Sequence, residues 1–268
     1  MTNRNHIWKM EGKANASVGS GLLILLFFFL SFSSAAQVAQ WRGEMRDGKF
    51  GSEKKLLKSW PAEGPELLLK VDNLGKGFSS PIMADNIIYI TGLKDTLDYI
   101  SAVDMEGNIL WQRTYGVAWK QSYPDTRTSP TIDGERIYVF SGSGRLSCLN
   151  RADGSVIWAV EVDRDYESEW HLWGISESPL VDGDRVICSP GGAKTSVVAF
   201  DKMTGKEVWR TEPVGGPRCY ISPVIYEYDK FRLILAATGQ YLIAIVPETG
   251  KVAWSYQYWS SENGISLD

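Results

Sequence analysis

The sequence predicts an all-β fold, a β-propeller of four-stranded antiparallel blades. The main observation is a motif that occurs four times, at intervals of 45 to 51 residues, and ends each time in tryptophan. A period near 45 residues with a glycine turn and a final tryptophan is typical of propeller repeats, in which one unit forms one blade. We therefore expect about four blades, in a ring that is incomplete. The copies are AVDMEGNILW, CLNRADGSVIW, AFDKMTGKEVW and AIVPETGKVAW, which end at Trp111, Trp158, Trp209 and Trp254.

Each copy of the motif describes two strands joined by a tight turn. An Asp or Asn after the first strand folds its side chain back onto the backbone of the turn, and a glycine supplies positive φ. The second strand carries the tryptophan, whose large flat ring suits the space between neighbouring blades. We expect these tryptophans to be structural. The turn residues are Asp104, Asn150 and Asp201, followed by Gly107, Gly154, Gly205 and Gly250.

A Ser-Pro pair marks the start of each unit and advances in step with the tryptophan motif. Successive pairs are 49, 49 and 44 residues apart. The strands that follow them are apolar at consecutive positions, as in residues 137–140 and 186–188, so both faces of each sheet are expected to be buried. Asp133-Gly134 and Asp182-Gly183 predict tight hairpins between these strands. The pairs are Ser80-Pro81, Ser129-Pro130, Ser178-Pro179 and Ser222-Pro223.

Residues 1–36 have the features of a signal peptide. The apolar segment over residues 21–32 is too short to span a bilayer comfortably, and the small residues up to Ala36 suit signal peptidase. We expect cleavage after Ala36, an N-terminal arm over residues 37–66 and a propeller repeat domain over residues 67–268. The protein is then exported, to the periplasm or the extracellular space, with no stable membrane span. An uncleaved anchor is the alternative, and Met10 is a second candidate for the true start.

Charge and composition exclude some functions. Without residues 1–36 the chain has 25 Lys and Arg against 31 Asp and Glu, a net charge near −6. Nucleic-acid binding would need clustered Lys and Arg, so we expect none. Only His6 and His171 are present, and His6 leaves with the signal peptide, so a Ser-His-Asp or multi-histidine metal site would rest on His171 alone. We predict no catalytic residue and no metal ligand.

The three cysteines leave two alternatives open. Cys148 and Cys188 lie in apolar, strand-like segments, where cysteine behaves as a small hydrophobic residue. We expect buried free thiols. A disulfide between Cys188 and Cys219 in an oxidising compartment is the alternative, and it depends on a distance that the sequence does not contain.

The repeats resemble those of the pyrroloquinoline quinone (PQQ)-like β-propeller proteins. That family's motif is Ala-x-Asp-x-x-Thr-Gly-Lys-x-x-Trp, and the copy from Ala199 to Trp209 matches it throughout. Residues 40–50 and 60–70 also look like the start of secreted bacterial members. By this resemblance Leu67 to Lys70 would form a lone final strand of the last blade, with Leu69 where the repeat tryptophan would stand. Only 14 residues follow Trp254 to complete such a blade, so the ring is expected to stay open, with a tight four-bladed ring as the alternative.

The resemblance implies two main functions. One is a non-enzymatic scaffold, similar to the outer-membrane assembly factor BamB, which holds protein partners on its rim and needs no cofactor. The other is a quinoprotein dehydrogenase that binds PQQ and calcium and carries an adjacent cysteine pair over the quinone. The sequence has no Cys-Cys dipeptide, and four repeats are fewer than the eight blades of those enzymes. We therefore favour the scaffold, with PQQ-dependent alcohol or sugar oxidation as the alternative; another small-ligand or carbohydrate-associated role also stays open.

A ligand or partner surface is expected where the loops before the Ser-Pro pairs converge. These loops offer aromatic side chains together with one cation, Arg127, and one anion, Glu177. Arg127 and Glu177 would both face the channel, or would form a structural pair between adjacent blades, since buried charges need partners. The candidate residues are Phe78, Tyr123, Arg127, Trp173, Glu177 and Tyr220.

Overall fold

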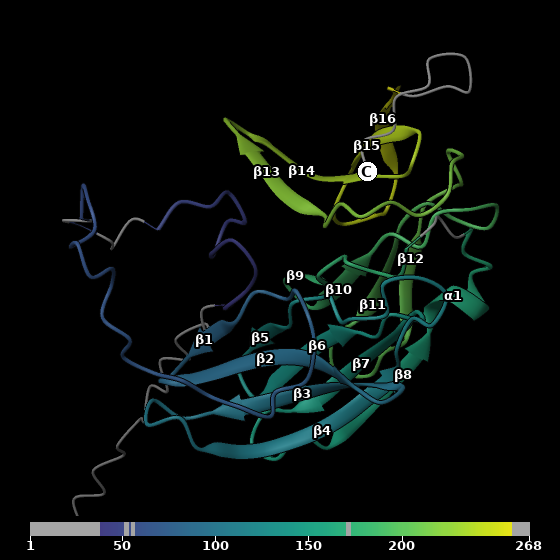
Figure 1. The fold of residues 1–268 in the computed structure, drawn as a ribbon. Helices are drawn as coiled ribbons and strands as arrows, with labels where there is room; N and C mark the ends of the chain where they lie inside the picture. The colour runs from purple at the N-terminus through teal and green to yellow at the C-terminus, as the bar shows by residue number, and fades with distance from the viewer. Residues whose placement is uncertain (1–37, 51–53, 55–56, 170–172, 259–268) are drawn as a thin grey trace, which may run out of the picture. The chain divides into compact units, whose positions relative to one another are not determined.

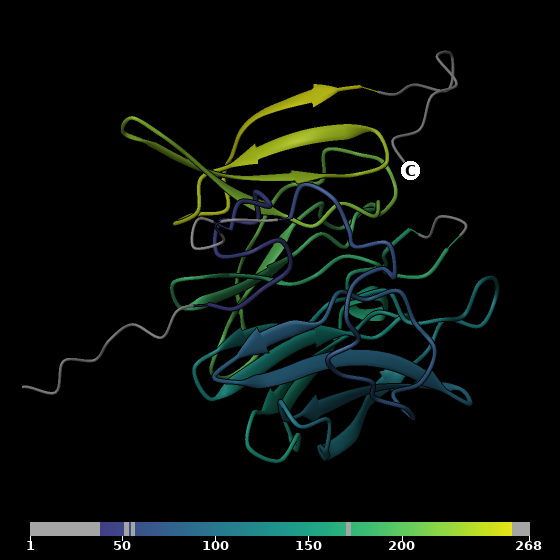
Figure 2. The same cartoon turned by 60° about the vertical axis from the view of Figure 1, so that its left-hand side comes forward.

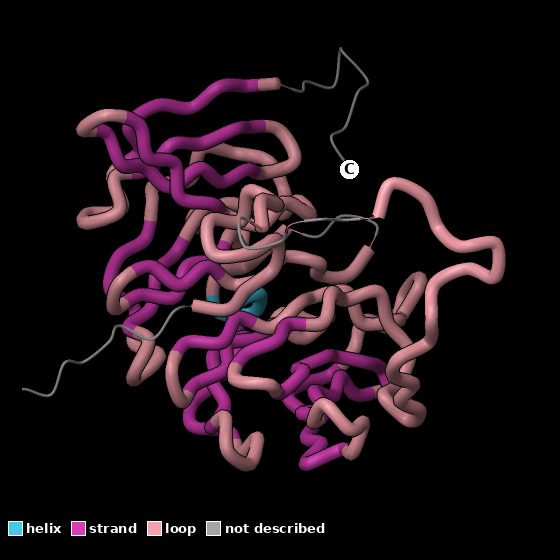
Figure 3. The backbone as a smooth tube through the Cα atoms, turned by 90° about the vertical axis from the view of Figure 1, so that its left-hand side faces the viewer, coloured by secondary structure: helices cyan, strands magenta, loops and turns pink. Residues whose placement is uncertain are grey.

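The computed structural model describes residues 38–50, 54, 57–169 and 173–258, and almost all of its regular structure is β (Figures 1 and 3). The strands form four separate antiparallel sheets of four strands, each in sequential order. This confirms the predicted fold class. The signal peptide expected over residues 1–36 lies outside the described residues, and no helix among the described residues is long and apolar enough to cross a membrane.

Each sheet is formed by one repeat unit, with strands linked by short turns. One helical turn, α1 (Val162–Asp165), follows the second sheet. The first sheet contains β1 (Ile82–Ala84), β2 (Ile87–Lys94), β3 (Leu97–Val103) and β4 (Ile109–Val117); the second contains β5 (Thr131–Asp133), β6 (Arg136–Phe140), β7 (Arg145–Asn150) and β8 (Val156–Glu161). The third contains β9 (Leu180–Asp182), β10 (Arg185–Cys188), β11 (Val198–Asp201) and β12 (Glu207–Arg210). The fourth contains β13 (Val224–Tyr228), β14 (Phe231–Ala237), β15 (Tyr241–Ile245) and β16 (Val252–Gln257). The strands of this fourth sheet, coloured green to yellow, lie side by side in Figure 2.

The four repeat tryptophans occupy the same register position in their sheets. Each lies on the fourth strand, opposite the small residue that opens the motif, and the extra residue of a β-bulge directly precedes each tryptophan on that strand. The small partners are Ala102, Cys148, Ala199 and Ala244, opposite Trp111, Trp158, Trp209 and Trp254.

The turns before these strands form as their residues dictate. In the third sheet, the Asp201 carboxylate accepts hydrogen bonds from the backbone N–H groups of Met203 and Thr204, at 3.1 and 2.8 Å. Gly205 then adopts φ of +72°. The other turn glycines also have positive φ, as the sequence predicts.

Three of the repeat tryptophans lie against the turn glycine of the following unit. The ring of Trp158 covers Gly205, and its Nε1–H donates to the carbonyl oxygen of Lys202 at 3.1 Å. Trp209 covers Gly250 in the same way and donates to the carbonyl oxygen of Pro247 at 2.9 Å. The indole N–H groups of Trp158 and Trp209 therefore find acceptors in the next blade.

The segment Leu67 to Lys70 is not a strand, which corrects the expectation of a lone strand in the last blade. The side chains of Leu67 and Leu68 are 75% and 83% exposed, and a strand needs a hydrogen-bonded partner that no described strand provides here. Leu69 does stand in the tryptophan position: its Cδ1 lies against Gly107, the turn glycine of the first sheet. The side chain therefore keeps the packing role without the strand.

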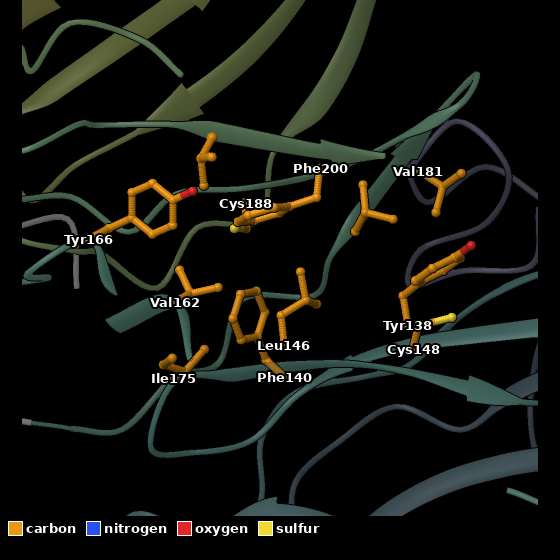
Figure 4. Packing of buried hydrophobic residues seen from close by; sticks show 12 residues of the cluster. Tyr138, Phe140, Leu146, Cys148, Val162, Tyr166, Ile175, Val181, Cys188 and Phe200 are labelled. Carbon is orange, nitrogen blue, oxygen red and sulfur yellow. The ribbon is translucent and has the colours of Figure 1, made fainter. Parts of the chain in front are cut away.

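Hydrophobic cores lie at the three seams between consecutive sheets. Figure 4 shows the core between the second and third sheets, where Tyr138, Phe140 and Leu146 face Cys188 and Phe200. The other two cores join the first sheet to the second and the third to the fourth. Among the described residues no core joins the fourth sheet to the first, so these residues form no closed ring.

All three cysteines are buried free thiols. The disulfide alternative for Cys188 and Cys219 is therefore wrong in this structure. Burial raises the pKa of the Cys219 thiol to about 12, so its nucleophilic thiolate form is scarce at neutral pH.

Candidate functional site

The Ser-Pro pairs join the blades to one another at the start of their first strands. The backbone N–H of Ser80 donates to Ser129 Oγ at 2.9 Å, the N–H of Ser129 to Ser178 Oγ at 3.2 Å, and the N–H of Ser178 to Ser222 Oγ at 2.9 Å. Each serine hydroxyl thus accepts from the blade before it. This serine ladder fixes the positions of the backbone carbonyls beside it.

Arg46 of the N-terminal arm inserts into the space lined by these carbonyls. Its side chain is buried, with 3% of the residue exposed, and all of its N–H groups face oxygen atoms. Nε donates to Gln40 Oε1 at 2.7 Å; Nη1 donates to the carbonyl oxygens of Ser178 and Pro223, both at 3.0 Å; Nη2 donates to Thr131 Oγ1 at 3.3 Å and to the carbonyl oxygen of Pro179. We call these five acceptors the guanidinium cage.

The arm is also held by its backbone. Ala39 and Ile132 form an antiparallel bridge, with N–H to carbonyl distances of 2.9 and 2.8 Å. Sequence reasoning missed Arg46, although it lies in the segment over residues 40–50 that resembles secreted propeller proteins. The sequence does show an arginine in a short, non-repeating segment before the blades. Its hydrogen-bond partners lie in three later repeats, so the sequence alone does not connect them to it.

Glu177 is fully buried beside the cage. Its Oε1 accepts a hydrogen bond from the N–H of Ser189 at 2.9 Å. Burial raises the pKa of this carboxyl to about 7, against the attraction of Arg218 and Arg46. Burial likewise lowers the pKa of Arg46 to about 9, opposed by the charge of Glu177. These groups form an interior charge cluster.

Arg218 completes the cluster from the loop before the fourth sheet. Its Nη2 lies 3.1 Å from Asp163 Oδ1, with both side chains almost fully buried. Its guanidinium also lies over the ring of Phe140, 5.2 Å from the centroid. Burial raises the pKa of Asp163, while the nearby Arg218 charge opposes that rise.

The predicted pairing of Arg127 with Glu177 is wrong. The guanidinium of Arg127 instead donates to the carbonyl oxygen of Tyr123, four residues earlier in the same loop. Glu177 turns inward, where Arg46 and Arg218 supply the positive charge. A buried carboxylate beside two arginines has no need of a third partner at the surface.

The other candidate residues lie in two groups. Phe78 and Tyr123 are 73% and 72% exposed, and the N–H of Phe78 donates to the carbonyl oxygen of Thr126 at 2.7 Å, next to Arg127. Trp173 and Tyr220 are half-buried and lie against each other across a different seam, with ring centroids 5.5 Å apart and ring planes tilted by 43°. The structure therefore joins the loop of Phe78 to the loop of Tyr123 and Arg127, brings Trp173 and Tyr220 together separately, and places Glu177 in the interior.

His171 lies outside the described residues. Among the described ones, no group of three His, Cys, Asp or Glu side chains is close enough to hold a metal ion.

The fold and the serine-linked blades define a β-propeller built from tryptophan-ended PQQ-type repeats. Residues 96–267 match the family described as outer membrane protein assembly factor BamB, and the chain belongs to that family. The resemblance seen in the sequence is thereby confirmed.

Enzymes are also similar to this chain. The quinohemoprotein alcohol dehydrogenases ADH-IIG and ADH IIB of Pseudomonas putida are 27% and 25% identical to it over 146 and 245 residues, which cover 52% and 70% of this chain and 20% and 34% of theirs. The solved structure of quinohemoprotein alcohol dehydrogenase from Comamonas testosteroni shares the fold, with a TM-score of 0.53 at 20% identity, over 72% of this chain and 37% of that one. The chain thus spans well under half the length of these relatives.

Proposed function

We propose that this protein is an exported, non-enzymatic propeller that binds a protein partner in the assembly of outer membrane proteins. The observation that carries the proposal is that Phe78 and Tyr123 are both exposed, on two loops that meet beside Arg127. Aromatic and arginine side chains are enriched in protein interfaces, and tyrosine and arginine are enriched among the few residues that dominate their binding energy. The two loops that present them are joined by the backbone hydrogen bond from Phe78 to Thr126, which lowers the cost of ordering them on binding.

The residues at the centre support a role without PQQ. The three cysteines are separate, buried residues, so none forms the adjacent pair that the quinoprotein resemblance requires. The oxygen atoms at the inner ends of three blades already accept hydrogen bonds from Arg46. The described residues therefore do not fit the quinone site, and we assign no catalytic step.

Site-specific photo-cross-linking in a bacterial host tests partner binding. A photoreactive amino acid replaces Phe78 or Tyr123, with Met105 and Met203 as control positions. Both methionines are also exposed, at 48% and 51% against 73% and 72% for Phe78 and Tyr123. They lie in turns between third and fourth strands, at the opposite end of their sheets from the loops before the first strands. We expect the same cross-linked product at Phe78 and Tyr123, containing an outer membrane protein or one of its assembly factors, and no such product at the controls. Equal labelling at all four positions would refute the proposed surface.

A quinoprotein dehydrogenase is the second candidate, favoured by the similar alcohol dehydrogenases. Incubation with PQQ and calcium, followed by a dye-reduction assay with alcohols and sugars, separates the two functions. We expect no turnover and no stoichiometric quinone. Dye reduction that disappears when a chelator removes calcium would establish the enzyme instead.

A further inference from the structure

The guanidinium cage matches the hydrogen-bonding capacity of an arginine side chain in full. A guanidinium group has five N–H donors in a planar fork and no acceptor. Arg46 makes five hydrogen bonds, one from Nε and two from each terminal nitrogen, and the acceptors are oxygen atoms throughout. The number of acceptors equals the number of N–H donors, and each donor points at an acceptor.

Four of the five acceptors belong to the blades, and three of them, on Ser178, Thr131 and Pro179, have residues that are also hydrogen-bonded within the blades. The serine ladder holds Ser178 through its N–H bond to Ser222 Oγ. Thr131 is oriented independently, because its hydroxyl donates to the carbonyl oxygen of Pro179 at 2.6 Å and so turns its lone pairs toward Arg46. Only Gln40 comes from the arm itself. Bonds that do not involve Arg46 therefore hold three of the four blade residues that supply these oxygens.

The geometry selects a guanidinium over an ammonium ion. The two oxygens that Nη1 reaches come from different blades, Ser178 before the third sheet and Pro223 before the fourth. A lysine ammonium is a compact charge with three donors, so it would leave carbonyl oxygens without partners in a buried place, which is costly. The negative charge comes from Glu177, whose attraction for Arg46 acts within the cluster that also contains Arg218 and Asp163.

We propose that the inner ends of the second, third and fourth blades form a binding site for guanidinium, whose natural ligand class is an arginine side chain. Arg46 fills this site from within the chain. Without that side chain the site accepts a guanidinium compound from solution. The inference concerns the centre of the blades and is independent of the surface around Phe78.

Chemical rescue of Arg46→Ala tests the site. Thermal unfolding is followed in millimolar methylguanidinium, methylammonium or sodium chloride at pH 7.5. We expect methylguanidinium to raise the Tm of this variant in a saturable way. Methylammonium should need a concentration at least about tenfold higher to raise the Tm by the same amount. Arg42→Ala is the matched control, because Arg42 belongs to the same arm but is exposed. Neither this variant nor the unaltered protein should respond.

Two results would overturn the inference. One is an equal response of Arg46→Ala to methylguanidinium and methylammonium, and the other is no response to either. If Arg46→Ala does not fold unaided, the yield of folded protein after dilution from urea replaces Tm as the measurement. Refolding that improves with methylguanidinium and not with methylammonium supports the site, and equal yields in all three solutions reject it.

Discussion

The ring of Trp158 lies against Gly205 so closely that a methyl group on this glycine would stand 2.7 Å from Cε3 of the indole. Trp111 has the same relationship to Gly154, and Trp209 to Gly250, with distances of 2.6 Å. The turn glycine therefore meets two requirements, because it adopts positive φ and leaves room for a tryptophan from the previous blade. Two substitutions can separate these requirements.

Gly205→Ala should destabilise the protein by about 3 kcal/mol, since it adds overpacking to the cost of a side chain at positive φ. Gly183→Ala is the matched control. Gly183 has φ of +57° in a hairpin turn, but no atom lies within 4 Å of an added methyl group. We expect a loss of about 1 kcal/mol there, from backbone strain alone. Urea unfolding measures both, and equal losses would show that the tryptophan contact does not constrain the turn.

The repeat tryptophans should differ in their contribution to stability. Trp209 is 7% exposed and is covered by the turn of the fourth sheet, whereas Trp254 is 44% exposed. We expect Trp209→Ala to lower the free energy of unfolding by about 3 to 5 kcal/mol, as a large buried truncation. Trp254→Ala should cost about 1 kcal/mol, because less of its surface is buried. Comparable losses in urea unfolding would mean that Trp254 is covered in solution.

The repeats were predictable from sequence because their signals are local. The turn of Asp201 and Gly205 and the strand of Trp209 lie within nine residues, and the same pattern recurs. The centre was not predictable in this way. Arg46 and the carbonyl oxygen of Pro223 are 177 residues apart, and no periodic pattern links an arm to the blades that it contacts. The inward turn of Glu177 has the same origin, because its partners Arg46 and Arg218 come from different parts of the chain.

Glu177 should make the protein less stable as pH rises. Its pKa is about 7 in the folded state against a usual 4.5, because burial disfavours the ionised form. Between these values the Glu177 carboxyl is ionised in the unfolded chain but protonated in the folded protein. The contribution of Glu177 to the free energy of unfolding therefore falls as pH rises from about 4.5 to 7 and is constant above pH 7. The loss is about 3 kcal/mol at 1.36 kcal/mol per pKa unit.

Glu177→Gln should remove this part of the pH dependence while keeping an oxygen for the N–H of Ser189. The groups that face it, Arg46, Arg218 and Asp163, remain in both proteins, so the difference between the two stability curves reports Glu177 together with its coupling to these groups. Glu212→Gln, at an exposed position, controls for the loss of one negative charge. Urea unfolding at pH 5 and pH 8 is the measurement. A slope in Glu177→Gln as steep as in the unaltered protein would contradict the assignment.

The outer face of the fourth sheet should make this chain associate with itself. Strand register places Tyr228, Phe231, Trp254 and Tyr256 on one face, opposite the face that packs on the third sheet. Tyr228, Phe231 and Tyr256 are 68%, 55% and 65% exposed, and contiguous apolar faces of this kind favour association. We expect the mass measured by light scattering to rise with protein concentration.

The double variant Phe231→Lys with Tyr256→Lys should abolish that rise in mass, because it introduces charge into the face. The control double variant Met105→Lys with Met203→Lys, on exposed turns, should leave the rise unchanged. A monomer at every concentration, or equal effects of both pairs, would show that this face is not where copies of the chain meet.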